Sequence, residues 1–251
     1  MKKLLTVLSA MVLCLGMFSA SMAAGPDDLT YMTEQYPPFN YEEGGQLKGI
    51  AVDLLDAMLK KMGASKSAQD VSLLPWAQGY KRVQEEANTC LFSMTLTDAR
   101  KPLFKWVGPV IATKISVFAK KGSGVSIGSA ADLGKYKYGV IRDDIGQQLL
   151  EDAGVGKDKM DITSKNEANI KKLNAGRIDA WAYEESSAKY QLKMAGLNPA
   201  DYEVAYVLQE GTLNFAFNKS VSDDLLAQFQ AALDALKADG TVQSIQDKYL
   251  K

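Results

Sequence analysis

The order of the strand and helix patterns is the feature that most constrains the fold of this chain. Short apolar runs alternate with segments whose apolar residues recur at helical spacing, and glycine or proline separates them. The alternation begins at residue 29, breaks at the loop 121–124 and restarts with the apolar run 136–141. Such alternation is typical of an α/β protein with mainly parallel sheets, and its restart predicts two lobes.

Before the break, residues 29–33 are expected to form a strand, and Asp53 is expected to cap a helix that ends at Gly63. The other expected elements there are a short broken strand at 73–76, a helix at 80–87, and strands at 90–95 and 115–119. After the break we expect strands at 136–141, 178–183, 202–208 and 213–217, and helices at 147–153, 167–174 and 187–194. Ser222 is expected to cap a long helix through Ala238, and a last helix ends near Tyr249.

Residues 1–24 have the three-part layout of a secretory signal. Lys2 and Lys3 precede an apolar run at 4–18, and small residues follow at 19–24. The apolar run is too short for a comfortable membrane span, so the sequence predicts a periplasmic protein released by cleavage. Cys14 leaves with this segment. Cys90 is then the only cysteine, and no internal disulfide is possible.

Charge and composition exclude several functions. Without Lys2 and Lys3, 27 of the 29 basic residues remain against 30 acidic ones, a net charge of −3. The chain has no basic block, so nucleic acid is not an expected partner. The absence of histidine excludes Ser–His and Cys–His nucleophile pairs and His-ligated zinc, and we expect neither a metal nor a cofactor. About 227 residues are enough for one large or two small domains.

The segment from Ser93 to Arg100 follows an expected strand and is the first candidate binding segment. Ser93, Thr95 and Thr97 place hydroxyls at alternate positions, and Arg100 lies where a helix is expected to start. The planar guanidinium matches a carboxylate in a bidentate way, and free N–H groups at a helix start favour an anion. The alternative is that Thr97 caps the helix and Arg100 is a solvated surface residue.

Two more polar groups follow expected strands: Arg142–Asp144 and Glu184. Ligand groups gather at the carboxyl ends of parallel strands. One lobe therefore offers a cation with hydroxyls, and the other offers carboxylates. A free amino acid presents the matching pair, a carboxylate for Arg100 and an ammonium for Glu184. The alternatives are that Asp143 or Asp144 caps the next helix, and that Glu184 is merely solvated.

Several short motifs, taken in their order and spacing, resemble those of one protein family. Tyr36-Pro37-Pro38-Phe39 with 47–54 is similar to its opening signature, 95–100 to its carboxylate-binding segment, 175–180 to a strand lead-in, and 239–241 with 247–249 to its closing helices. The chain thus resembles the periplasmic solute-binding proteins of family 3, the polar amino acid receptors of ABC transporters. The resemblance implies a type II two-lobe α/β fold in which each lobe is a mainly parallel sheet flanked by helices.

The resemblance also implies a role for individual residues. It implies an aromatic wall at Tyr36, a side-chain pocket lined by Trp76, ligand contacts from Ser93 and Thr95, a carboxylate clamp at Arg100 and an ammonium clamp at Glu184. Asp144 is a further candidate contact, and Arg142 and Tyr183 are possible ones. The alternative for Tyr36 and Trp76 is an ordinary place in the core, because aromatic rings are commonly buried.

The sequence departs from the family pattern at two places. Arg142-Asp143-Asp144 stands where the family commonly has glycine followed by serine or threonine, and 87–90 replaces the usual Gly-x-x-Asp. The chain is therefore expected to belong to a divergent branch. Its ligand stays open: a polar, cationic or aromatic side chain is compatible with the candidate residues, and a dicarboxylate is compatible if Arg142 faces the cleft.

The resemblance implies reversible capture of a small amino acid-like ligand. We expect one lobe at 25–112 plus 213–251 and the other at 113–212, joined by crossovers near 111–114 and 210–213 that act as a hinge. The expected partner is an ABC permease in the inner membrane, and the protein itself is expected to be a monomer. Two alternatives are a sensory subunit that feeds a receptor, and a dehydratase-like enzyme using Glu184 or Asp144 as general acid. No two acids stand at a spacing that would support such an enzyme.

Overall fold

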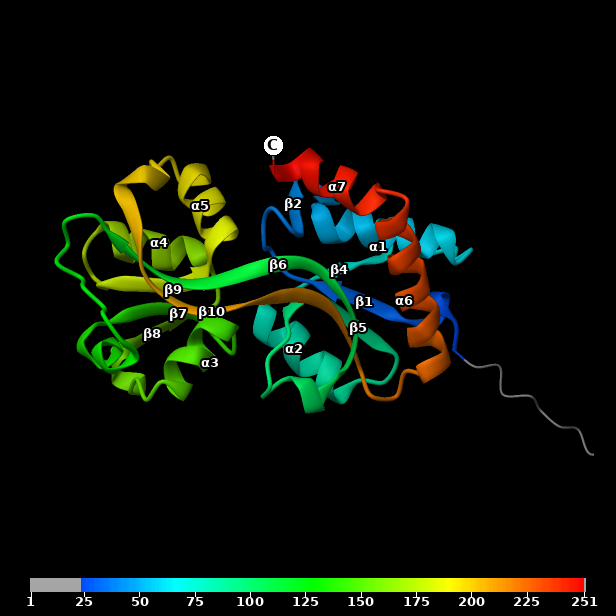
Figure 1. Cartoon of the computed structure of the whole chain (residues 1–251), viewed down its shortest axis with the longest axis horizontal. Helices are drawn as coiled ribbons and strands as arrows, with labels where there is room; N and C mark the ends of the chain where they lie inside the picture. The colour runs from blue at the N-terminus through cyan, green and yellow to red at the C-terminus, as the bar shows by residue number, and fades with distance from the viewer. Residues whose placement is uncertain (1–23, 251) are drawn as a thin grey trace, which may run out of the picture.

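The computed structural model describes residues 24–250, whose strands form one eight-stranded sheet and one two-stranded hairpin (Figure 1). The spatial order of the large sheet is β4 (Ser72–Leu73), β1 (Thr30–Thr33), β5 (Thr89–Thr95), β10 (Tyr202–Phe217), β6 (Lys105–Lys120), β9 (Ala180–Glu184), β7 (Tyr138–Ile141) and β8 (Met160–Thr163). The hairpin is β2 (Tyr41–Glu43) with β3 (Gln46–Lys48). β1 runs parallel to β4 and β5, and β7 runs parallel to β8 and β9.

Helices lie on both sides of the sheet in two groups (Figure 1). The first lobe holds β1, β4 and β5, with α1 (Ile50–Lys61), α6 (Asp223–Ala238) and α7 (Thr241–Leu250) on one side and α2 (Trp76–Glu85) on the other. The second lobe holds β7, β8 and β9, with α4 (Asn166–Asn174) and α5 (Glu185–Met194) on one side and α3 (Ile145–Asp152) on the other. The α/β class with mainly parallel sheets flanked by helices is therefore confirmed.

Two long strands connect the lobes and correct the strand predictions. β6 and β10 are 16 residues each and pair antiparallel, whereas the sequence predicted separate short strands at 115–119, 202–208 and 213–217. β6 pairs with β9 from Ile115 onward, and β10 pairs with β5 from Leu213 onward. Residues 112–114 and 210–212 pair with each other between these regions. The expected crossovers therefore coincide with a two-stranded ribbon between the two lobes.

The core of the first lobe forms where α1 and α6 cover the sheet. Leu55 and Met58 of α1 are fully buried against Phe229 of α6 and Phe217 of β10 in one cluster. The rings of Phe217 and Phe229 lie 5.1 Å apart, centroid to centroid. Burial of an aromatic side chain of this size stabilises a fold by about 1.5–3 kcal/mol. The long amphipathic helix predicted after Ser222 is confirmed, and the Ser222 hydroxyl accepts a hydrogen bond from the Leu225 N–H.

The start of α1 differs from its prediction. The helix begins at Ile50, three residues before the predicted cap Asp53, and Gly49 occupies the N-cap position with φ +125°. A Cβ at Gly49 would lie 2.4 Å from the carbonyl oxygen of Phe39, so a close backbone approach requires glycine here. Asp53 instead accepts hydrogen bonds from Lys248 and Tyr249 of α7, at 2.7 and 2.9 Å. The carboxylate therefore joins α1 to the last helix.

The segment predicted as a broken strand at 73–76 is divided between two elements. β4 ends at Leu73, and Trp76 opens α2 after Pro75, so α2 begins four residues earlier than the predicted 80–87. Proline is tolerated before the first helical turn because an N–H group at this position would have no acceptor within the helix. Trp76 and Tyr80 thus lie one turn apart on the same helix face, where their rings stack with centroids 5.5 Å apart, and Trp76 Nε1 reaches the Asp143 carbonyl of the second lobe.

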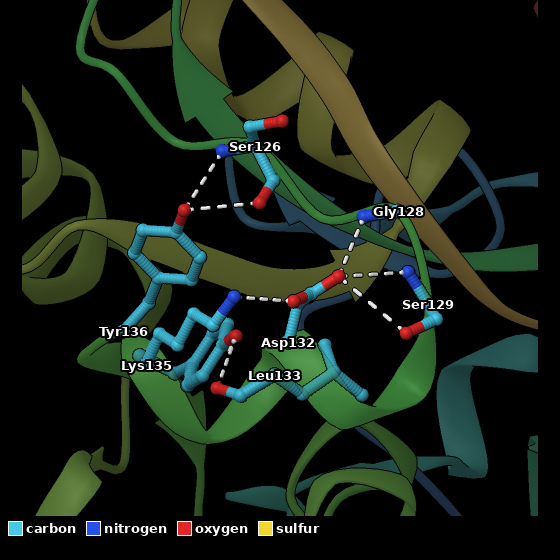
Figure 2. Close-up of polar contacts among 8 residues, drawn as sticks. Ser126, Gly128, Ser129, Asp132, Leu133, Lys135 and Tyr136 are labelled. Atoms are coloured by element: carbon cyan, nitrogen blue, oxygen red, sulfur yellow. Dashed lines mark hydrogen bonds and ion pairs between the residues drawn. The ribbon is translucent and has the colours of Figure 1, made fainter.

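Polar contacts fix the chain as it enters the second lobe (Figure 2). The Asp132 carboxylate accepts hydrogen bonds from the N–H groups of Gly128 and Ser129, at 3.0 and 3.1 Å, and pairs with Lys135. The Tyr136 hydroxyl accepts from the Ser126 N–H at 2.9 Å. These bonds anchor a 3-10 helix, η4 (Ala130–Lys135). The other 3-10 helices are η1 (Pro26–Asp28), η2 (Ala68–Asp70), η3 (Lys101–Leu103), η5 (Lys157–Lys159) and η6 (Pro199–Asp201).

The predicted secretory signal, apart from Ala24, lies outside the described residues. Between residues 24 and 250 no helix has the length and apolar character needed to cross a membrane. Cys90 is fully buried in β5, and burial raises the pKa of its thiol well above the usual value. A protonated thiol is a poor nucleophile, so packing accounts for Cys90.

Candidate ligand-binding site

A tight turn after β5 positions Arg100. The Thr97 hydroxyl accepts a hydrogen bond from the Arg100 N–H at 3.1 Å, and the Thr97 carbonyl accepts from the Lys101 N–H at 2.8 Å. Only the short 3-10 helix η3 follows. The helix start predicted at this position is therefore present only as a 3-10 helix with Arg100 at its N-cap position, and Thr97 caps the turn before it. Without an α-helix behind it, Arg100 supplies the positive charge by its side chain alone.

Arg100 lies fully buried between aromatic rings of the first lobe and polar groups of the second. Its residue is 1% exposed, and its guanidinium carbon lies 5.3 and 5.2 Å from the ring centroids of Trp76 and Tyr80. Its Nε donates to the Gln148 Oε1 of α3 at 3.0 Å. Burial lowers the pKa of Arg100, and the negative charge of Asp144 opposes that shift. The surface alternative for Arg100 is therefore wrong.

Asp143 joins the lobes through its backbone. Its φ is +58°, in the left-handed region that residues other than glycine seldom adopt. Its carbonyl oxygen accepts hydrogen bonds from Trp76 Nε1 at 2.8 Å and Gln148 Nε2 at 3.0 Å, with Arg100 Nη2 at 3.4 Å. The departure from the family pattern thus keeps the backbone geometry of a turn, because aspartate tolerates this conformation better than most residues.

Asp144 occupies the N-cap position of α3 without forming a capping hydrogen bond from its side chain. The residue is 7% exposed, and its Oδ2 has no hydrogen-bond partner. Burial raises the pKa of Asp144, while the nearby charge of Arg100 and the N–H groups of Ile145 and Gly146 at the start of α3 lower it. The sequence left open whether this residue caps the helix or contacts a ligand. An unpartnered buried carboxylate oxygen is costly, and this favours the second role.

Glu184 ends β9 and caps α5. It is 2% exposed, and its Oε2 accepts a hydrogen bond from the Ser187 N–H at 2.7 Å. Burial raises the pKa of Glu184, and the N–H groups of Ser187 and Ser186 oppose that shift. The alternative of a solvated carboxylate is wrong. The second lobe therefore supplies a buried acid, and the first lobe a buried guanidinium.

Two tyrosines from different lobes meet beside this acid. The ring centroids of Tyr36 and Tyr183 lie 5.5 Å apart, and Tyr183 stacks on Trp181 at 5.2 Å. The hydroxyl of Tyr183 is buried, and the side chains of Asn166 and Ser187 lie beside it. Burial raises the pKa of Tyr36, and the negative charge of Glu184 raises it further. The structure thus places Tyr36, predicted as an aromatic wall, within electrostatic reach of Glu184.

Ser93 and Thr95 are both buried at the end of β5. Ser93 has φ +63°, a conformation that a residue other than glycine seldom adopts, and its hydroxyl has no hydrogen-bond partner. The Thr95 carbonyl lies 3.5 Å from Arg100 Nη1. Backbone strain next to an unused buried hydroxyl is a feature of binding sites. Arg142, by contrast, is exposed and takes part in none of the ion pairs formed within residues 24–250.

The sequence missed Glu34, which follows β1. Burial raises the pKa of its carboxyl well above the usual value, the charge of Asp144 raises it further, and the charge of Arg100 lowers it. The structure therefore brings two acids together, contrary to the expectation that no such pair exists. Position at the carboxyl end of a strand was the signal available for Glu34. Tyr80 and Gln148 were also missed, each four residues after a recognised position on its helix.

Comparison with known proteins identifies the family of this chain. Residues 29–251 match the family described as bacterial extracellular solute-binding proteins, family 3. The chain belongs to this family. An L-arginine-binding protein of Pseudomonas aeruginosa is 31% identical over 232 residues, covering 85% of this chain and 84% of the relative.

Solved structures support the fold of this solute-binding protein. An ancestral arginine-binding protein bound to arginine superposes with a TM-score of 0.72 at 26% identity, covering 89% of this chain and 98% of that one. A histidine kinase sensor domain similar to periplasmic binding proteins superposes with a TM-score of 0.77 at 20% identity, covering 88% and 96% of the two chains. The second likeness concerns the fold alone.

The raised pKa of Glu34 predicts a pH dependence of stability that a Glu34→Gln variant makes measurable. The pKa of Glu34 is higher in the folded state than its ordinary value of 4.5, so the folded state holds the proton more tightly. The contribution of this pKa shift to the free energy of unfolding is fully present below that ordinary value. It is lost as the pH rises through the raised pKa of the folded state. The amide does not titrate, so the variant is expected to gain stability relative to the wild type as pH rises.

Urea unfolding of both proteins between about pH 4 and pH 8 tests this expectation, because the linear extrapolation gives the free energy of unfolding of each protein. Acids with lowered pKa, such as Asp27 and Asp132, titrate equally in both proteins and cancel in the difference. A difference in unfolding free energy that stays constant across this range would contradict it.

Proposed function

We propose that this solute-binding protein captures a free amino acid between its two lobes and delivers it to an ABC permease of the inner membrane. The observation that carries the proposal is the pair of opposite charges, Arg100 in the first lobe and Glu184 in the second, both buried. The ligand carboxylate binds Arg100 with help from the hydroxyls of Ser93 and Thr95, and its ammonium binds Glu184. Each buried charge then has the partner that it needs.

The ligand side chain lies among Tyr36, Trp76 and Tyr183, with Asp144 as a further contact. The names of two similar proteins support an amino acid as ligand: one is called an L-arginine-binding protein and the other was solved bound to arginine. Both names describe those proteins. For this chain they support an amino acid ligand whose carboxylate contacts Arg100 and whose ammonium contacts Glu184.

Capture proceeds by rotation of the lobes about the ribbon at 111–114 and 210–213. The lobes are 25–112 with 213–251, and 113–212. A two-stranded ribbon bends more readily than a strand flanked on both sides, because fewer hydrogen bonds oppose it. The hydrogen bond from Trp76 Nε1 to the Asp143 carbonyl and that from Arg100 to Gln148 join the lobes and stabilise the closed form. Ligand binding shifts the population toward this form, which the permease recognises.

A thermal-shift screen of the chain lacking residues 1–24 against all proteinogenic amino acids tests the proposal. A ligand present at 100 times its dissociation constant adds about 2.7 kcal/mol to the free energy of unfolding, which raises the midpoint clearly. We expect a shift with a small group of amino acids and with none of their carboxyl amides. A flat response to every amino acid would contradict capture. Recovery of unchanged ligand afterwards would argue against the enzymatic alternative.

Sensing is a second candidate, supported by the similarity of the fold to a histidine kinase sensor domain. Both candidates bind the same ligand and differ in what recognises the closed form. Uptake of radiolabelled ligand into cells with and without the gene distinguishes them. Transport predicts that uptake falls in the deletion strain and returns when the gene is restored, whereas sensing predicts unchanged uptake.

A further inference from the structure

Two tyrosines outside the proposed ligand contacts join the lobes. Tyr41 belongs to β2 of the first lobe, and Tyr190 belongs to α5 of the second (Figure 1). Their ring centroids lie 5.7 Å apart, and the ring planes are tilted by 53°. Burial raises the pKa of the Tyr41 hydroxyl, and the Tyr190 side chain beside it raises that pKa further. The two side chains therefore contact each other across the boundary between the lobes.

The pair lies beside a groove that both lobes line. The groove has a volume of about 250 Å³, and its walls include Tyr41 and Pro37 of the first lobe and Tyr190 and Met194 of the second. Met194 is 64% exposed, so the groove is open to solvent. None of the residues proposed to contact the amino acid lines this groove. A substitution at Tyr190 can therefore change the fit between the lobes without removing a proposed ligand contact.

The first lobe holds Tyr41 in place through the hairpin and the last helix. Tyr41 pairs with Lys48 across the hairpin, and the Lys48 ammonium lies 5.3 Å from the centroid of the Tyr41 ring. The Tyr249 hydroxyl of α7 accepts a hydrogen bond from the Gly49 N–H at 3.2 Å and donates one to Asp53 of α1 at 2.9 Å. The hairpin is thus joined to α1 and α7. A side chain already held in its contact geometry loses less entropy when the contact forms.

The second lobe presents Tyr190 from the side of α5. Ala188 and Leu192 are buried, and Tyr190 stands two positions from each, which places it on a different face of the helix. Tyr190 is half-buried where its ring meets Tyr41. An aromatic pair stabilises an arrangement beyond the apolar area that it buries, by a factor of about 2 to 10 in the equilibrium constant. Rotation of one lobe away from the other separates the two rings, and this contribution is lost.

We propose that Tyr41 and Tyr190 form a latch that favours the closed form before any ligand binds, and that both are positioning residues for capture. The inference rests on the proposed rotation of the lobes about the ribbon. Because the latch raises the fraction of protein already in the closed form, it raises the apparent affinity for a ligand that binds this form. The factor is the same for every such ligand, since neither tyrosine is a proposed ligand contact.

The fraction of closed protein without any amino acid tests the latch directly. Lys61→Cys in α1 and Lys157→Cys in η5 place a spin label on an exposed position of each lobe, and the native Cys90 is fully buried. Unfolding in guanidinium followed by refolding removes any amino acid carried through purification. Pulsed dipolar spectroscopy then gives the populations of the short and long distances between the labels. The wild type with a mixture of all proteinogenic amino acids supplies the closed reference.

We expect a closed population in the ligand-free wild type, and a ratio of closed to open protein that falls by about 2- to 10-fold in Tyr190→Ala. Tyr206→Ala is the matched control and is expected to keep the ratio, because Tyr206 is a half-buried tyrosine packed against the core of the second lobe. Tyr41→Ala, alone and combined with Tyr190→Ala, completes a double-mutant cycle. If the rings act through each other, the double variant loses no more than either single variant.

The outcomes separate the latch from the proposed function. A ligand-free wild type with no closed population, an unchanged ratio in Tyr190→Ala, or additive losses in the double variant would each overturn the latch. Closure of the same proteins by the amino acid mixture would then still support capture. A mixture that closes neither the wild type nor Tyr190→Ala would instead contradict capture, while the ratio measured without amino acids would decide the latch by itself.

Discussion

Replacing Arg100 by alanine is expected to weaken binding of the amino acid ligand by about 30- to 5,000-fold, which corresponds to about 2–5 kcal/mol. The size follows from burial: the guanidinium is 1% exposed, so the ligand carboxylate that replaces water around it has no other cation to bind. The stacked rings of Trp76 and Tyr80 hold the guanidinium in place, which lowers the entropy lost when the ligand binds.

Calorimetry of the variant measures this loss, and two further variants interpret it. Arg82→Ala removes a guanidinium that pairs with Glu86 on the surface of α2, and we expect unchanged affinity. Arg100→Lys keeps the charge but loses the planar fork, so an intermediate affinity is expected. Far-UV circular dichroism checks the fold, because the substitution also removes the bond to Gln148. Unchanged affinity in a folded Arg100→Ala protein would disprove the carboxylate clamp.

Periodicity predicted most elements of this fold, but it failed where the chain passes between the lobes. The helix at 223–238 and strand β5 were predicted correctly because the burial pattern of each element stays the same along its whole length. β6 and β10 change environment midway: Ile115 to Ala119 are buried, whereas the central residues of β10 are only half-buried. The apolar pattern is therefore interrupted although the strand is not. Gly108 and Pro109 lie inside β6, although both residue types usually interrupt a strand pattern.

The rule that ligand groups lie at the carboxyl ends of strands predicted Arg100, Asp144 and Glu184 as ligand groups, and the structure buries all three. The same rule applied to β1 would have predicted Glu34, which lies two residues before the aromatic signature that begins at Tyr36. The carbonyl of Asp143 could not be found in this way, because every residue has a carbonyl and only the turn geometry selects this one. Backbone contributions to a site depend on tertiary structure, which a single sequence does not reveal.

Replacing Glu184 by glutamine is expected to weaken ligand binding by at least about 30-fold while the fold is retained. The amide oxygen can still accept the hydrogen bond that the Ser187 N–H donates, so α5 keeps its cap. What is lost is the negative charge that pairs with the ligand ammonium. Glu185→Gln changes the next residue, which pairs with Lys189, and is the matched control with little expected effect.

A double-mutant cycle assigns this loss to the ammonium rather than to a general disturbance. The second change is made in the ligand, by comparing the amino acid found in the screen with its analogue that lacks the α-amino group. If Glu184 binds the ammonium, the wild type loses much of its affinity for that analogue, whereas Glu184→Gln loses little further. We expect a coupling energy of about 1.5–3 kcal/mol between the carboxylate and the ammonium. Additive losses would show that Glu184 acts through the α5 cap, and the ammonium would then require another partner among the buried acids.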